Sequence, residues 1–215
     1  PARAARAAAP PAAPPAPEAA ADQAADKAFA LALYYHRAGD FEKALVHYRA
    51  VLERNELNAE AHNNLGLLYQ EKGLLDEAVR QFERALFVNP RYARARMHLG
   101  VTLLRQGRID AATAELRSAH ELAPGDADIL VNLALAHKAA GRRAEAVAAL
   151  RRALTLDPGH PAAHYNLGVL HDEAGEPALA VEHYRSFVQR AGGEYAGLVP
   201  DVRARLEALD RTLRR

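Results

Sequence analysis

Histidine is the residue type in this sequence with the widest chemical range, because imidazole can bind a metal or move a proton near neutral pH. Ten histidines are present. No pair of them forms the H-E-x-x-H pattern that places two zinc ligands on one helix face. His160 and His164 are four residues apart, but Pro161 lies between them. We therefore predict no metal site.

Nucleophilic catalysis finds equally little support. Cysteine is absent, and the two serines, Ser118 and Ser186, do not stand in the G-x-S-x-G turn that exposes a nucleophile. Neither a Walker phosphate loop nor a Rossmann fingerprint occurs. We expect no catalytic residues, no cofactor and no enzymatic activity of this chain, so any function should depend on binding.

Charge and hydropathy narrow the class of partner. The net charge is +1, with 28 basic and 27 acidic residues, so no strong field should attract nucleic acid. No apolar run approaches the roughly 20 residues that cross a bilayer, and we expect no direct membrane insertion. Abundant alanine and arginine fit a GC-rich bacterial genome. The compartment, cytoplasmic or periplasmic, stays open because a chain without cysteine gives no redox signal.

The elements that position all these side chains come from an internal repeat. The segment HNNLG at 62–66 recurs as HYNLG at 164–168, and Gly66, Gly100 and Gly168 are separated by multiples of 34, with Ala134 at the missing step. A second glycine follows seven residues later, where a helix of about 14 residues should end in a left-handed conformation. This second series is Gly39, Gly73, Gly107, Gly141 and Gly175.

Within each period the apolar residues have helical spacing, and proline ends three of the periods. Each period should therefore be a hairpin of two helices. Small residues in the first helix predict a close approach to the second, and we expect Gly66 to lie against Ala78 and Ala85.

The pattern L-G-x2-Y, then A-x3-F, then P at this period resembles the tetratricopeptide repeat. The resemblance implies an all-α fold, a right-handed α-solenoid of five helix-turn-helix repeats. The tryptophan that is usual early in each repeat is replaced, and the fifth copy departs most, as a terminal repeat does. The five copies span 25–58, 59–92, 93–126, 127–160 and 161–194.

The two ends differ from the repeats. Residues 1–24 are nearly all alanine and proline, which predicts a disordered tether; the first residue is Pro1, so a signal peptide, an anchor or a further domain can precede it. In 195–215, Val202, Leu206, Leu209 and Leu213 share one helix face. We expect this amphipathic helix to cap the solenoid, with a free helix awaiting a partner as the alternative.

Family geometry implies that the first helices line a concave groove. One row of inward positions is mainly apolar, and a second row carries an amide or imidazole in each of four repeats. That polar row resembles the asparagine ladder of the O-linked N-acetylglucosamine transferase repeats, where amides hold a peptide backbone; simple packing against neighbouring helices or water is the alternative. The expected peptide-binding groove consists of Phe29, Leu33, Asn63, Asn64, Leu67, Met97, His98, Val101, Val131, Asn132, Leu135, Tyr165, Asn166 and Val169.

Our interpretation is a non-catalytic scaffold or adaptor that binds an apolar or amphipathic segment of a protein partner in this groove. Two alternatives belong to other classes. One is the targeting domain of a larger, glycosyltransferase-like enzyme. The other is a structural subunit that packs into a multiprotein assembly through its convex face. The identity of the partner, the oligomeric state and membership of a larger complex stay open.

Overall fold

The computed structural model describes residues 17–214, which form eleven α-helices, one 3-10 turn and no strand. The helices are α1 Pro17–Arg37, α2 Phe41–Arg54, α3 Ala59–Glu71, α4 Leu75–Val88, α5 Ala93–Arg105, α6 Ile109–Leu122, α7 Ala127–Ala139, α8 Arg143–Leu156, α9 Pro161–Glu173, α10 Pro177–Arg190 and α11 Val199–Leu213, with the 3-10 turn η1 at Gly193–Tyr195. The predicted all-α fold is confirmed.

Glycine ends the turn inside each hairpin. Gly39, Gly73, Gly107, Gly141 and Gly175 all have φ between 71° and 75°, and no other residue type in the described chain has positive φ. An L side chain rarely adopts this left-handed conformation, so the second glycine series marks the hairpin turns as predicted. Asp40 and Asn58 then cap following helices by accepting hydrogen bonds from the backbone amides of Lys43 and Ala61.

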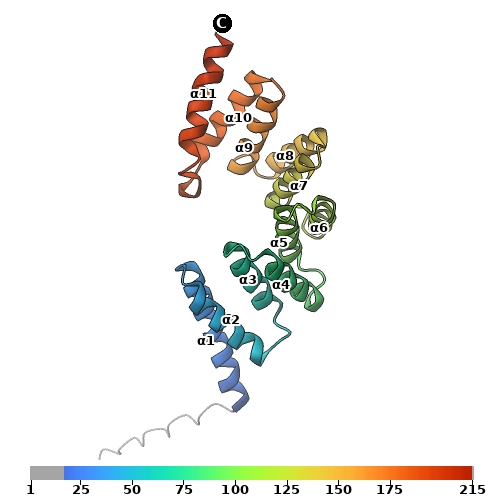
Figure 1. The fold of residues 1–215 in the computed structure, drawn as a ribbon, viewed down its shortest axis with the longest axis vertical. Helices are drawn as coiled ribbons and strands as arrows, with labels where there is room; N and C mark the ends of the chain where they lie inside the picture. Colours follow the sequence, from blue (N-terminus) through green and yellow to red (C-terminus); the bar gives the residue numbers. More distant parts are fainter. Residues whose placement is uncertain (1–16, 215) are drawn as a thin grey trace, which may run out of the picture.

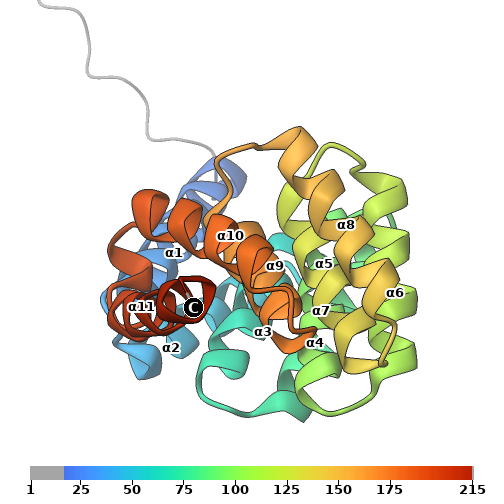
Figure 2. The same ribbon diagram turned by 90° about the horizontal axis from the view of Figure 1, so that it is seen from above.

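The hairpins stack into an open arc, with α1 at one end and α11 at the other (Figure 1). Viewed along the long axis, α5 and α7 lie on the inside of the curve and α6 on the outside (Figure 2). The first helix of a hairpin thus faces the concave side and the second the convex side. The predicted solenoid architecture is confirmed by this arrangement.

The core runs along the solenoid as clusters shared by neighbouring hairpins. Leu65 and Leu68 of α3, for example, are buried together with Ala44 and Tyr48 of the preceding hairpin. The same contact recurs down the chain because the repeat places apolar residues at equivalent points. Stacking of neighbours, and not the burial within a single hairpin, therefore completes each core.

A close approach within the second hairpin involves an aromatic ring. A methyl group placed on Gly66 of α3 would lie 2.6 Å from Cε1 of Phe82 on α4. The expected neighbours Ala78 and Ala85 are buried nearby, but the atoms that need the missing side chain belong to Phe82. The close approach predicted at Gly66 is present, and the Phe82 ring supplies the atoms nearest to the glycine.

The first and last helices show where the predicted boundaries of the tether and of the C-terminal helix differ from the structure. α1 begins at Pro17, so residues 17–24, which we assigned to the tether, are helical, with proline at the first helical position where its missing N–H costs nothing. The rest of the predicted tether, residues 1–16, lies outside the described residues. At the other end α11 packs Val202 and Leu209 against α10, while Leu213 is largely exposed.

Among the described residues, no helix has the length and apolar character that a membrane crossing requires.

Candidate functional site

The N-terminal part of the predicted groove is a hollow between two consecutive inner helices. It has a volume of about 350 Å³ and lies between α1 and α3. Leu33 and Leu67, at the same point of two repeats, provide apolar surface, and Asn64 adds an amide. His36, Arg37 and Glu71 complete the lining.

A second hollow continues from the first along α1. Its volume is about 500 Å³, and it shares Leu33 and Arg37 with the first hollow. Ala30, Tyr34 and Ala38 form the rest of its wall. An extended apolar segment or a helix can therefore meet continuous surface from α1 to α3.

The row of aliphatic residues continues past this hollow. Val101, Leu135 and Val169 are all half-buried, as Leu33 and Leu67 are. In the inner helices that no other helix covers, half-burial at this point leaves part of the side chain open to a ligand. These five residues are called the aliphatic row below.

The other predicted apolar row is mostly core. Val131 and Asn63 are buried, so neither can meet a ligand at the surface. Met97 packs against a cluster that includes Leu116 and Leu133. Phe29 similarly contacts Tyr48 edge to face, with ring centroids 6.2 Å apart. We therefore remove Asn63 and Val131 from the candidate site, because their side chains point into the contact between inner helices.

The predicted polar row is partly occupied by bonds within the protein. The Nδ2 groups of Asn132 and Asn166 donate to the carbonyl oxygens of Asp128 and Ala162 in their own helices, at 2.9 and 2.8 Å. Each amide uses one of its two N–H groups in this way, so its second N–H and its side-chain oxygen have no partner in the described chain. These two amides can therefore both donate hydrogen bonds to a ligand and accept them.

His98 interrupts that row and bonds to the preceding repeat. Its Nδ1 donates to Oδ1 of Asn63 across 2.8 Å, and Nδ2 of Asn63 donates to Asn64 at 3.3 Å. Burial, reinforced by the nearby Arg94 guanidinium, lowers the pKa of His98 to about 4. His98 is therefore neutral near pH 7 and serves as a link between α3 and α5.

The C-terminal end of the groove is covered by α11. Tyr165 and Val169 of α9 pack against the cluster that contains Val202 and Leu209. Arg205 of α11 also donates to both carboxylate oxygens of Asp172 on α9, at 2.7 and 2.6 Å. The open part of the groove is consequently the stretch from α1 to α7.

Three polar side chains early in their repeats have a structural role that sequence reasoning missed. His62 bonds to Gln81 on α4 and to the carbonyl oxygen of Glu56 in the loop before α3, at 2.8 and 2.9 Å. Arg96 bonds in the same way to Glu115 and to the carbonyl oxygen of Pro90. His164 repeats the pattern with His183 and Pro158.

These residues stand where the family usually has tryptophan, and they join a loop to the second helix of the hairpin. The partner on that second helix always lies 19 residues further on, and the loop carbonyl always lies six residues back. This fixed spacing of polar residues is the feature of the sequence from which these contacts could have been predicted. The geometry is that of a structural brace.

The histidines do not converge on a metal site. Among the side chains that the structure describes, residues 26–214, no group of three or more histidine, aspartate or glutamate residues is placed to hold a metal ion. His164 and His183 do share a hydrogen bond of 3.1 Å between their Nδ1 atoms. Burial lowers the pKa of both rings, that of His183 to about 4, so this pair is neutral near pH 7.

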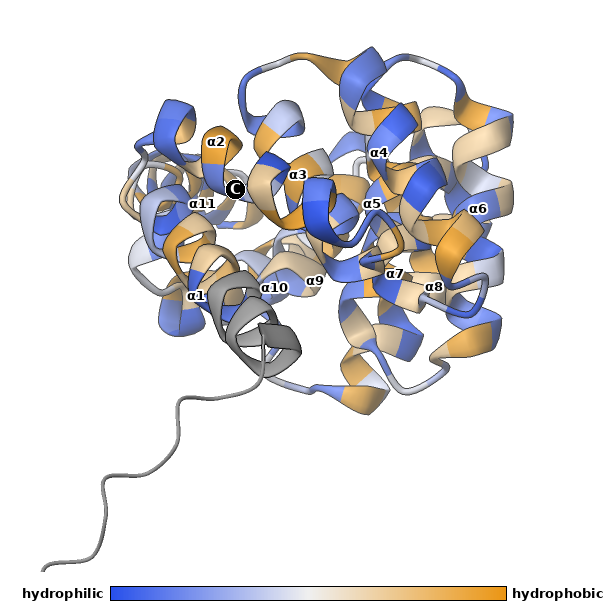
Figure 3. Cartoon of the chain, turned by 90° about the horizontal axis from the view of Figure 1, so that it is seen from below, coloured by the Kyte–Doolittle hydropathy of each residue, from blue (hydrophilic) through white to orange (hydrophobic). Residues whose placement is uncertain are grey.

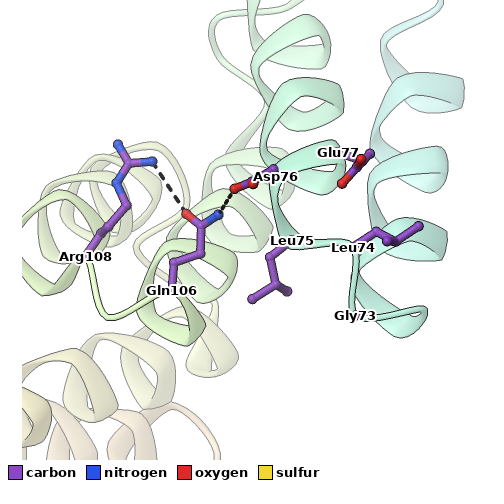
Figure 4. Close-up of a pocket in the computed structure, with 7 residues that line it drawn as sticks. All are labelled: Gly73, Leu74, Leu75, Asp76, Glu77, Gln106 and Arg108. Carbon is purple, nitrogen blue, oxygen red and sulfur yellow. Dashed lines mark hydrogen bonds between the residues drawn. The ribbon is translucent and has the colours of Figure 1, made fainter.

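The turn edge of the solenoid carries a further hollow, of about 570 Å³, between the second and third hairpins. Nε2 of Gln106 donates to Asp76 at 2.7 Å, and Arg108 reaches Oε1 of Gln106 at 3.5 Å (Figure 4). Lys72 forms an equivalent ion pair with Glu42 one repeat earlier. The polar groups here pair with each other across repeats, so this edge stabilises the stack of hairpins.

Comparison with protein families identifies the repeat. A family model described as "Tetratricopeptide repeat" matches residues 65–127 and 131–195. A model described as "TPR repeat" matches residues 32–73, and a further "Tetratricopeptide repeat" model matches residues 103–152. No curated protein sequence matches the chain.

Solved structures agree on the fold. The chain resembles pilF of Pseudomonas aeruginosa with a TM-score of 0.74 and 25% identity, over 90% of this chain and 92% of that one. It resembles PilW, described as a widely conserved type IV pilus biogenesis factor, with a TM-score of 0.74 and 22% identity, over 86% and 93%. YrrB, described as a TPR protein with an unusual peptide-binding site, gives 0.61 and 24%, over 80% and 92%.

Proposed function

Since the chain belongs to the tetratricopeptide-repeat family, we propose that it is a non-catalytic scaffold that holds an apolar or amphipathic segment of a partner protein against its concave side. The observation that carries this proposal is the hollow between α1 and α3. Leu33 and Leu67 give it an apolar floor, and the side-chain amide of Asn64 stands beside them.

The remaining aliphatic row supports the same reading. Val101 and Leu135 continue the half-buried surface beyond the hollow, so several side chains of one ligand can be accommodated in succession. Burial of one aliphatic side chain contributes about 1.5–3 kcal/mol, while association costs about 4–15 kcal/mol. A few such contacts predict binding in the micromolar range.

The test selects peptides from a displayed library against the intact chain and titrates the selected peptides by calorimetry. Leu67→Asp should weaken their binding by more than about tenfold, because a carboxylate on the hollow floor cannot be buried unpaired. The exposed Arg151 on α8 offers the control, and Arg151→Glu should leave affinity unchanged. Equal affinity of wild type and Leu67→Asp, at unchanged helix content, would refute the groove.

The convex-face alternative also has an observation in its favour. Phe87 and Leu57 are 75% and 61% exposed and line a hollow of about 300 Å³ together with His62. The residues equivalent to Phe87 in the other repeats are polar: Glu53, Glu121, Thr155 and Gln189. An isolated pair of large apolar side chains there suits a structural subunit that packs through its outer side.

Phe87→Glu separates the two readings. If the chain is a structural subunit, this variant loses its assembly partner while library peptides still bind the groove. The third reading, a targeting domain of a glycosyltransferase-like enzyme, depended on the amide row, and the likeness of that row to the transferase repeats stays a prediction.

A further inference from the structure

The N-terminal side of α1 presents a face that is covered in every later repeat. In α3 the corresponding residues are Leu65 and Leu68, which are 3% and 0% exposed because α1 and α2 pack over them. In α1 the same positions are Leu31, which is half-buried, and Tyr34, which is 65% exposed. We call Leu31 and Tyr34 of α1, together with Ala38 directly after its end, the leading face of α1.

The residues equivalent to Leu31 and Tyr34 are buried in all the later inner helices. In α5, α7 and α9 they are Leu99 and Thr102, Leu133 and Ala136, and Leu167 and Leu170. Figure 3 looks onto the α1 end of the molecule, where no described helix covers α1 from outside. The residues of the leading face therefore occupy positions that contact a preceding hairpin in every later repeat, but here no described helix packs against them.

Arg37 provides an independent polar signal beside the leading face. Its equivalents in α3, α5 and α9 reach back to the preceding inner helix, whereas the equivalent in α7 is Ala139. Glu71 pairs with His36 at 3.3 Å, and Glu173 pairs with Lys138 at 2.7 Å. Arg105 donates to the carbonyl oxygen of Gln70 at 3.1 Å. Each of these contacts spans 35 residues.

Arg37 is the first member of that series, and in the described chain it has no ion pair or hydrogen bond. It lines the hollow of about 500 Å³ that also contains Tyr34 and Ala38. A guanidinium at this position lacks the oxygen that a preceding helix would provide. A carboxylate is the group that pairs with it most strongly.

We propose that the leading face of α1 docks an amphipathic helix of another polypeptide, with an apolar stripe over Leu31 and Tyr34 and an acidic side chain that pairs with Arg37. The helix would lie where an additional hairpin would stack. This site is separate from the aliphatic row, although Arg37 borders both.

Charge favours an acidic partner helix at this face. A head-to-head second copy would oppose two Arg37 side chains, and residues 1–16 contain two arginines and no acidic residue. An end-to-end copy would bring α11, which exposes Arg203 and Arg211 as well as Asp201 and Glu207, so its charge is not matched to Arg37. We therefore assign the carboxylate to a helix of a different polypeptide, and a dimer of this chain in sedimentation would overturn the assignment.

The probe is a lactam-stapled helical peptide of about four turns, with leucines at i, i+3, i+4 and i+7 and a glutamate at the edge of that stripe. Calorimetry gives its affinity for the intact chain, and amide chemical shifts locate it. Binding that shifts the amides of Leu31, Tyr34 and Ala38 supports the site. Tyr34→Asp should weaken binding by more than about tenfold, because it places a charge in the apolar contact.

The charge pair is tested by exchange. Arg37→Glu should weaken the peptide about three- to fivefold, and a peptide with lysine in place of glutamate should recover the loss on that variant alone. Leu67→Asp should leave the peptide affinity unchanged, which separates this site from the groove. The proposal is overturned if Tyr34→Asp binds like wild type, if Leu67→Asp alone removes binding, or if sedimentation shows a dimer that Tyr34→Asp dissociates.

Discussion

His98 and Asn63 join consecutive inner helices through a partly buried hydrogen bond of 2.8 Å between Nδ1 and Oδ1. They are 35 residues apart, one more than the repeat period. His36 with Glu71 and Lys138 with Glu173 have the same separation. The solenoid thus joins neighbouring hairpins by polar contacts at two registers, since Asn63 with His98 lies seven residues earlier in the repeat than the other two pairs.

This contact predicts an acid-sensitive stability. Burial lowers the pKa of folded His98 to about 4, whereas an unfolded histidine titrates near 6.5. Between these values the unfolded chain binds the proton more readily, so the free energy of unfolding should fall as the pH decreases from about 6.5 to about 4 and then level off. One proton gives a slope of at most about 1.4 kcal/mol per pH unit.

His98→Asn isolates this contribution, because asparagine occupies the equivalent position in α3, α7 and α9. Urea unfolding at several pH values should show a smaller slope for the variant than for wild type in that window. His183, whose pKa burial also lowers to about 4, keeps its own contribution in both proteins. Identical slopes would show that His98 does not become more acidic on folding.

A second prediction concerns Gly66 and the ring of Phe82. Gly66→Val adds atoms where even a methyl carbon would lie 2.6 Å from the ring, and Phe82 is fully buried and cannot move away. The cost should be about 1–3 kcal/mol of unfolding free energy, measured in urea. Gly125→Val is the matched control, since nothing lies within 4 Å of that position. A variant at Gly66 as stable as wild type would show that α3 and α4 can separate freely.

Much of this fold follows from the period alone. Gly73 and Gly107 stand where the chain must turn with positive φ, and the structure places them at the turns. The positions of the aliphatic row could also be predicted, because Leu67 and Val101 are one 34-residue period apart. Local rules at equivalent positions determine these features, so one sequence is sufficient to find them.

Other features depend on contacts that the period does not specify. Asn63 and Val131 have the register of groove residues but are buried, because neighbouring inner helices pack closely enough to cover them. Pro17 begins α1 although it follows a proline-rich stretch, since proline is tolerated at the first helical position. The brace at His62 could not be predicted from His62 alone, because its partner Gln81 lies on another helix.

A third prediction concerns the attachment of α11. The bidentate pair of Arg205 with Asp172 joins the capping helix to α9, and the hydrogen bonds from Arg205 lower the pKa of Asp172. Because the folded pKa is lowered, this contribution is complete above the unfolded aspartate pKa near 3.9 and is lost as the pH falls through the folded value.

Arg205→Ala should speed amide hydrogen exchange in α11 without loosening α3 or α5. The expected loss is about 0.5–1 kcal/mol, since Arg205 is half exposed to solvent. Arg203 is exposed on the same helix, and Arg203→Ala should leave exchange unchanged. Uniform acceleration along the whole chain would mean that the cap supports the solenoid globally.

The last prediction compares two residues of the groove. Val101 is half-buried in the aliphatic row, so Val101→Asp should weaken a groove-selected peptide by more than about tenfold while circular dichroism stays unchanged. Asn132 already donates one of its two N–H groups to the carbonyl of Asp128, so its second N–H and its oxygen are left for about one hydrogen bond with a ligand backbone. Asn132→Ala should therefore cost at most about 0.5–1.5 kcal/mol of binding free energy. Calorimetric titration of the same peptide against both variants measures the ratio. If Asn132→Ala weakens binding as much as Val101→Asp, recognition depends on the peptide backbone, and the amide row, instead of the aliphatic row, becomes the principal binding surface.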